Sequence, residues 1–74
     1  MKEKFIKAIK EAFELDGSED LDLQSEFRQH DNWDSLTKLS LIAVLDEEFE
    51  VIIEENKFEK LTKFEDILKF INDL

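Results

Sequence analysis

Residues 32–49 read NWDSLTKLSLIAVLDEEF, and the predicted architecture is built around this stretch. Asp34 and Ser35 are residue types that favour the N-cap of a helix, because their side-chain oxygens accept hydrogen bonds from first-turn N–H groups. From there to Glu50, apolar residues recur at the spacing of one helix face. We therefore predict an amphipathic helix from Asp34 or Ser35 to Glu50. Its predicted core stripe comprises Leu36, Leu39, Leu41, Ile42, Val44, Leu45 and Phe49.

Two further helices are predicted on either side of this one. Apolar residues within 2–15 follow helical spacing, and Gly17, the only glycine, is a plausible stop for that helix. Near the other end, Thr62 and Glu65 fit a capping box, in which a threonine caps the helix and a glutamate follows three residues later. A last helix is therefore predicted from this box to about Leu74.

The connections are expected to be mostly irregular. Residues 18–33 show no sustained period and predict a long loop with one helical turn, while 56–61 leave room for a single turn of helix. Val51 to Ile53 is interpreted as an extended connector on the core. With no proline, the predicted fold class is all-α: a small antiparallel bundle of three main helices and one short helix, forming one domain over residues 1–74. The loop is predicted to be held to the core by Leu21, Leu23, Phe27 and Trp33.

The composition excludes several classes of function. The chain has 20 acidic and 10 basic residues, and its net charge of -10 disfavours binding to nucleic acid or to anionic membranes. Cysteine is absent, so any thiol chemistry needs a thiol from an attached group. No apolar run approaches the ~18 residues of a membrane span, and no signal peptide is evident, so we expect a cytoplasmic protein.

Few residues have the surroundings that catalysis or metal binding needs. His30 lies in the polar loop without an evident nucleophile or orienting partner, and we expect a solvated histidine there. The acidic run 16–22 resembles a calcium loop, but Leu21 and Phe27 stand where the EF-hand pattern needs glycine and glutamate. We predict no catalytic residue and no metal site. The acidic cluster 46–50 is either a solvated helix end or a docking surface for a basic partner.

The sequence around Ser35 is more informative than the tripeptide Asp34-Ser35-Leu36 alone. Residues 32–36 end a long loop and open a helix, residues 39–49 continue that helix into an acidic stretch, and residues 58–67 carry a short helix, a threonine and the last helix. Together these segments resemble the acyl carrier protein family over essentially the whole chain. The resemblance implies that Ser35 is the attachment serine and that Asp34 and Leu36 complete the attachment motif.

The resemblance also implies a carrier that acts as a cosubstrate of other enzymes. In this family a phosphopantetheinyl transferase moves 4'-phosphopantetheine from coenzyme A onto the motif serine, and the arm supplies the thiol that carries cargo as a thioester. A phosphodiester at a helix N-terminus faces free backbone N–H groups and the positive end of the helix dipole. Acyl-loading and acyl-processing enzymes would be further partners, and the bundle would shield an acyl chain. Function on a mobile arm favours a monomer.

The resemblance further implies that one face of the second helix meets partner enzymes. Thr37 and Ser40 stand where fatty-acid-synthesis carriers usually have acidic residues, which favours a specialised carrier for a modified lipid, a polyketide or a surface saccharide. Trp33 also departs from the small residues common before the motif, and we interpret it as an apolar plug of the loop. The implied partner face comprises Leu36, Thr37, Ser40, Ala43, Asp46 and Glu47.

Two alternatives remain open. An aminoacyl or peptidyl carrier would use Ser35 in the same way, although the Gly-Gly or Gly-Asp approach common in such carriers is absent. An unmodified acidic helical adaptor would use Ser35 only as a helix cap. The negative charge is concentrated around Ser35, since residues 16–50 hold eleven acidic and two basic residues. A basic modifying enzyme would dock there.

Overall fold

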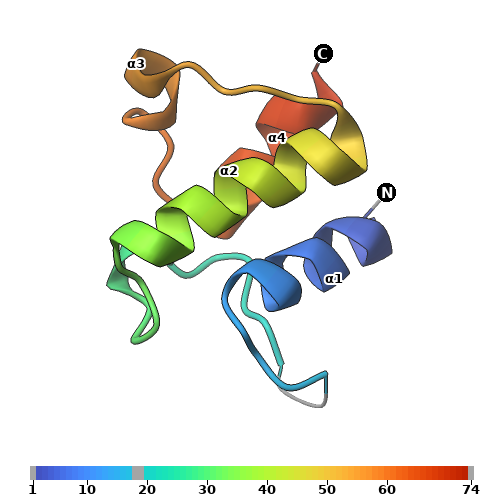
Figure 1. Ribbon diagram of the computed structural model, residues 1–74, viewed down its shortest axis with the longest axis vertical. Coiled ribbons are helices and arrows are strands. Elements are labelled where there is room, and N and C mark those ends of the chain that lie inside the picture. The colour runs from blue at the N-terminus through green and yellow to red at the C-terminus, as the bar shows by residue number, and fades with distance from the viewer. Residues whose placement is uncertain (1, 18–19, 74) are drawn as a thin grey trace.

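The computed structural model describes residues 2–17 and 20–73. The predicted domain and long loop also include residues 1, 18, 19 and 74, which lie outside the described residues. Within the described part, four α-helices and one 3₁₀ turn follow one another, and the predicted all-α class is confirmed (Figure 1). The elements are α1 (Lys2–Ala12), η1 (Phe27–Gln29), α2 (Ser35–Phe49), α3 (Glu55–Phe58) and α4 (Phe64–Asn72).

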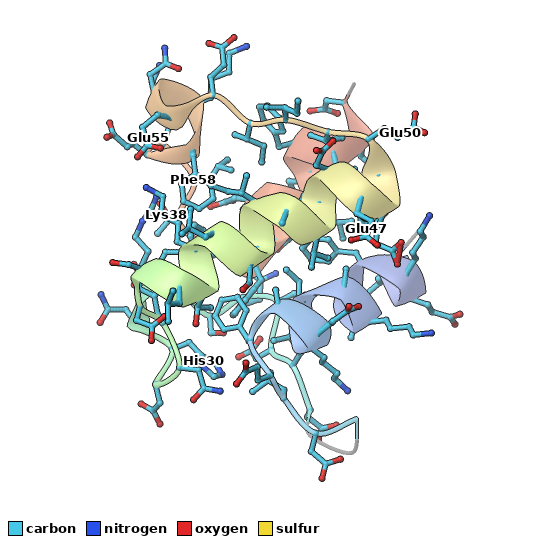
Figure 2. All side chains as sticks on the ribbon, viewed as in Figure 1. His30, Lys38, Glu47, Glu50, Glu55 and Phe58 are labelled. Carbon is cyan, nitrogen blue, oxygen red and sulfur yellow. The ribbon has the colours of Figure 1, made fainter. Side chains whose placement is uncertain are left out.

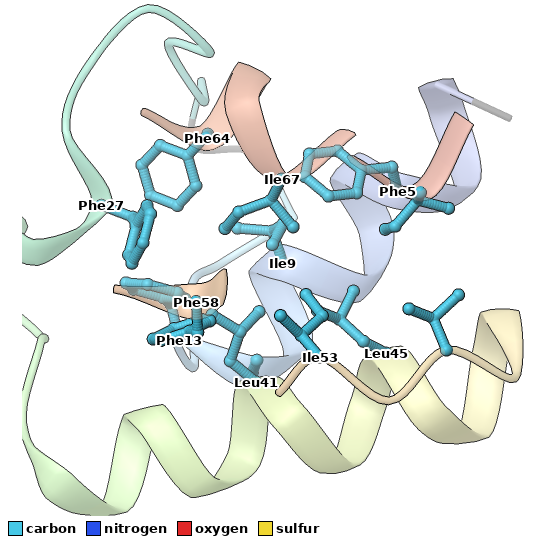
Figure 3. Close-up of a cluster of buried hydrophobic side chains, with 13 residues drawn as sticks. Phe5, Ile9, Phe13, Phe27, Leu41, Leu45, Ile53, Phe58, Phe64 and Ile67 are labelled. Atoms are coloured by element: carbon cyan, nitrogen blue, oxygen red, sulfur yellow. The ribbon is translucent and has the colours of Figure 1, made fainter. Parts of the chain in front are cut away.

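One apolar core joins these elements. Figure 3 shows side chains from α1, α2, α3 and α4 meeting in it, together with Phe27 of η1 and Ile53 of the connector. No polar side chain of the described residues is buried, so the core is held by apolar contact alone. Burying one such large side chain contributes about 1.5–3 kcal/mol. The fully buried large side chains are Phe5, Ile9, Phe13, Phe27, Leu41, Leu45, Phe58, Phe64 and Ile67.

The first helix ends before the glycine that was expected to stop it. Glu14 adopts the left-handed conformation, with φ of 56°, whereas Gly17 does not. Glu14 N donates to Glu11 O at 3.2 Å and Leu15 N donates to Lys10 O at 2.8 Å. These two bonds form a Schellman motif, which closes the helix and satisfies its last carbonyls. The predicted stop at Gly17 is therefore wrong.

The second helix begins and ends as predicted, but its buried face is narrower than the sequence indicates. Leu41 and Leu45 are fully buried, whereas Leu36 and Leu39 are 73% and 63% exposed. Successive residues turn by about 100° around a helix, so Leu36 and Leu39 lie opposite the core-facing pair. Their predicted place in the core stripe is wrong. The half-buried members of the stripe are Ile42, Val44 and Phe49.

The segment after α2 is the predicted extended connector. Val51 and Ile53 are buried, while Ile52 between them is 75% exposed. This alternation is what an extended chain produces when one side of it packs on a core. The connector leads into α3, where the predicted single helical turn is confirmed.

The long loop is fastened to the start of α4 by backbone hydrogen bonds. An isolated antiparallel bridge joins Glu26 to Lys63, and Phe27 N donates to Thr62 O at 3.2 Å. The first-turn N–H groups of α4 donate to loop carbonyls: Phe64 N to Ser25 O at 3.1 Å, and Glu65 N to Leu23 O at 2.9 Å. The loop thus provides the acceptors that a helix N-terminus otherwise lacks.

The cap of α4 is shifted by one residue from the predicted capping box. Lys63, rather than Thr62, is the N-cap residue. Asp66 Oδ2 accepts hydrogen bonds from Lys63 N at 2.8 Å and Thr62 N at 3.1 Å, which is the role predicted for Glu65. Glu65 instead accepts a hydrogen bond from the side chain of Gln24 in the loop.

None of the helices in residues 2–17 and 20–73 is both long enough and apolar enough to cross a bilayer.

Candidate functional site

Ser35 is the first residue of α2, and its side chain is exposed. Asp34 precedes it in extended conformation and caps the helix, with its Oδ1 accepting from Thr37 N at 2.7 Å. This backbone hydrogen bond stabilises the carboxylate and lowers the pKa of Asp34 below its ordinary value of 3.8. Among the described residues, no hydrogen bond uses the Ser35 hydroxyl. The hydroxyl is therefore open to a modifying enzyme.

The start of α2 is tied to the end of α1. Thr37 Oγ1 donates to Asn32 O at 2.7 Å, and Asn32 Nδ2 donates to Phe13 O at 2.8 Å. Because Phe13 is fully buried, this chain of hydrogen bonds anchors the loop before Ser35 to the core. Ser35 is thus placed by rigid neighbours although its own side chain is in solvent.

His30 differs from the solvated loop histidine that the sequence predicts. The side chain is half-buried, with its ring edge-on to Phe13 at 5.1 Å and to Phe64 at 6.4 Å between centroids. Its Nδ1 accepts from Asn32 N at 3.0 Å. These contacts give His30 a structural role in shaping the loop, and the prediction of a solvated side chain is wrong.

Trp33 packs as the predicted plug. It is half-buried, and its ring lies 5.4 Å from Phe27, 5.8 Å from Phe13 and 6.4 Å from Phe58 between centroids. The contact with Phe58 is stacked, with an interplanar angle of 20°. Trp33 therefore links the loop before Ser35 to the residue that follows α1, to η1 and to α3.

A polar pocket of about 400 Å³ adjoins Ser35 on the side of α1. Carboxylates, an amide and hydroxyls form most of its wall, from Glu14, Asp31, Asn32, Asp34, Thr37 and Ser40. Ala12, Phe13 and Leu36 complete the lining. On the other side of Ser35, α2 is joined to α3 by the ion pair between Lys38 Nζ and Glu55 Oε1 at 2.6 Å (Figure 2).

The structure brings most of the predicted partner face together on the solvent side of α2. Thr37 is the exception, because it is half-buried and its hydroxyl is bonded to Asn32 O. Sequence reasoning missed Leu39, which is exposed on the same side as Leu36 and Ala43. Their spacing of three and four residues was the available signal. The exposed predicted residues are Leu36, Ser40, Ala43, Asp46 and Glu47.

The residues at Ser35 fit a covalently attached phosphopantetheine arm. The hydroxyl is exposed, it stands at the N-terminus of a 15-residue helix, and solvent surrounds it on the side away from the core. The backbone N–H groups at the start of α2 were expected to be free to bind a phosphate. The N–H of Thr37 is not, because it donates to Asp34. In the described part of the chain, no three potential metal ligands gather at one place.

Comparison with known proteins identifies one relative by name. No family model and no solved structure matches the chain. The sequence is 42% identical over 50 residues to the acyl carrier protein of Thermosynechococcus vestitus, an alignment that covers 68% of this chain and 62% of the relative. The chain thus spans less than two thirds of that relative's length. This similarity and the helical fold support assignment of the chain to the acyl carrier protein family.

Proposed function

We propose that this protein carries an acyl intermediate as a thioester on a 4'-phosphopantetheine arm attached to Ser35, and presents it to biosynthetic enzymes. The observation that carries the proposal is the position of Ser35. Asp34 performs the capping, so Ser35 is not needed as a cap, contrary to the adaptor alternative. An exposed serine without a structural task, in a chain related to an acyl carrier protein, is best explained as an attachment point.

Each residue of the motif has a separate task in this proposal. Ser35 accepts the arm from coenzyme A, and a phosphopantetheinyl transferase supplies the catalysis, so no general base is required nearby. Asp34 orients Ser35 by fixing the first turn of α2. Leu36, 73% exposed, offers an apolar contact beside the reacting hydroxyl. The attached arm supplies the thiol that the chain lacks.

Partner enzymes are proposed to dock on the solvent side of α2. Asp46 and Glu47 give its C-terminal end a negative charge, which suits enzymes that carry basic patches. Leu36, Leu39 and Ala43 form an apolar strip nearer Ser35, in the part of α2 that precedes its first acidic residue, Asp46. This mixed surface favours the specialised carrier over a housekeeping carrier of fatty-acid synthesis. We propose that this carrier acts as a monomer in the cytoplasm.

Mass spectrometry tests the attachment directly. The purified chain is incubated with coenzyme A, magnesium and a broad-specificity phosphopantetheinyl transferase, beside a carrier known to be modified. We expect a single phosphopantetheine addition, which Ser35→Ala abolishes. Ser25→Ala is the matched control, because Ser25 is an exposed serine of the loop, outside the proposed docking surface, and this variant should be modified normally. If the native chain stays unmodified while the reference carrier is loaded, the proposal is wrong.

A further inference from the structure

The interior beside Ser35 is filled by aromatic rings. Figure 3 shows Phe13, Phe27, Phe58 and Phe64 gathered at one end of the core, and all four are fully buried. Their centroids lie 5.3 Å apart for Phe13 and Phe64, and 5.5 Å for Phe27 and Phe58. Trp33 closes the cluster from the loop by contacting three of these rings. Such separations are those of rings in direct contact.

Charged side chains from α2 and from η1 cover Phe58 in this cluster. Lys38 Nζ pairs with Glu55 and also lies 5.6 Å from the centroid of the Phe58 ring. Arg28 holds the other side of α3, with Nη2 donating to Phe58 O at 2.8 Å and its guanidinium 5.2 Å from the same ring. Phe58 is thus covered by two cations, and Figure 2 shows Lys38, Phe58 and Glu55 close together.

The pocket beside Ser35 on the side of α1 is polar. The pocket on the α1 side is walled by Glu14, Asp31 and Asp34, and an alkyl chain placed there would remove water from their carboxylates. Loss of hydration without a compensating hydrogen bond is unfavourable. An apolar cargo therefore meets carboxylates on one side and packed rings on the other.

We propose that Trp33 and Phe58 exclude alkyl chains from the interior, and that the cargo of this carrier is a short, polar acyl group that stays in solvent. This inference rests on the proposed function and departs from the expectation that the bundle shields an acyl chain. Protein interiors are close-packed, so an alkyl chain could enter only by displacing a ring. A short polar group has few methylenes to bury and gains little from shelter.

The inference is tested by loading the arm with cargo of two lengths. The transferase transfers acetyl-phosphopantetheine or octanoyl-phosphopantetheine from the matching coenzyme A thioester onto the native chain, Trp33→Ala and Trp33→Phe. The melting temperature and the rate of thioester cleavage by hydroxylamine are measured for each loaded form. For the native chain we expect both values to be the same with either cargo.

The variants distinguish the effect of the Trp33 ring from that of the rest of the protein. Trp33→Ala opens apolar space that an alkyl chain can fill, so its octanoyl form should melt at least about 4 °C above its acetyl form and resist hydroxylamine. Trp33→Phe keeps a ring and should behave like the native chain. If Trp33→Ala does not fold, Phe58→Leu provides the same comparison.

The outcomes distinguish this inference from the proposed function. A native chain whose octanoyl form melts higher, or is cleaved more slowly, than its acetyl form overturns the inference and leaves the carrier function intact. An octanoyl chain that stabilises neither the native protein nor the opened variants overturns the role of the two rings. A native chain that cannot be loaded with either cargo overturns the proposed function, and the inference with it.

Discussion

Arg28 is the side chain on which the position of α3 depends. Its guanidinium donates to the carbonyls of Phe58 and Leu61, at the end of α3 and just beyond it. The same group lies 4.6 Å from the centroid of the Phe27 ring and 5.2 Å from that of Phe58. A helix of four residues cannot hold itself together in water, so contacts such as these must fix it. We predict that Arg28→Met destabilises the whole fold.

The size of the effect follows from these contacts. A hydrogen bond from a charged donor contributes about 1.5–3 kcal/mol, and a cation over an aromatic ring adds about 0.5–1 kcal/mol at exposed sites. At the lower ends of these ranges the two hydrogen bonds and two ring contacts amount to about 4 kcal/mol. Because Arg28 is half-buried, water replaces part of what is lost. We expect the free energy of unfolding to fall by about 2–3 kcal/mol in total. In a domain of this size that lowers the melting temperature by roughly 8–24 °C.

Urea unfolding followed by circular dichroism measures this change. The midpoint should fall at an unchanged slope, because the surface exposed on unfolding stays the same. Arg28→Lys keeps the charge but not the forked geometry, and should lose about half as much. Lys60→Met removes an exposed cation from the same region and serves as the control. A loss for Arg28→Met below about 0.5 kcal/mol, or equal to that of Lys60→Met, would mean that Arg28 does not hold α3 in place.

Acidification should destabilise the fold below about pH 4, because hydrogen bonds from the N–H of Thr37 and from the N–H of Lys63 lower the pKa values of Asp34 and Asp66. Both carboxylates then contribute fully above their unfolded pKa, and that contribution is lost as the pH falls through the folded values. Asp66→Asn should flatten the melting temperature against pH between pH 5 and about 2, and an unchanged slope contradicts this. Asp46→Lys with Glu47→Lys should slow phosphopantetheine transfer several-fold without lowering the melting temperature, because steering by basic patches is lost while cations suit the C-terminal end of a helix. Equal transfer rates at low salt would show that this end of α2 is not the docking surface.

The features predicted correctly are those encoded locally. The start of α2 follows from an N-cap residue directly before a periodic apolar run, and Asp34 indeed caps the helix. The connector after α2 follows from a β-branched run with no partner strand, and its alternating burial agrees. In both places, neighbouring residues supply the interactions that define the element.

The features that were missed depend on residues far away in sequence. Both Glu65 and Asp66 could complete a capping box, and hydrogen bonds from α4 to Leu23 O and Ser25 O select the register that uses Asp66. The end of α1 depends on a glutamate in the left-handed conformation, a conformation that glutamate does not favour locally. Likewise, the exposure of Leu39 depends on which side of α2 its neighbours cover. Spacing places Leu39 on the same side of α2 as Leu36 and Ala43, but it does not say which side the rest of the chain covers, and it gives no sign of the other two choices.

The position of Trp33 also gives the protein an optical probe of its own. The chain contains one tryptophan and no tyrosine, so its near-ultraviolet emission comes almost entirely from a single indole. That indole lies two residues before Ser35 and is stacked on Phe58. Any event that loosens the ring cluster or wets the loop should shift this emission to longer wavelength. Partner docking of the kind proposed, if it disturbs the ring cluster, can therefore be followed in real time, without a dye, on the unaltered protein.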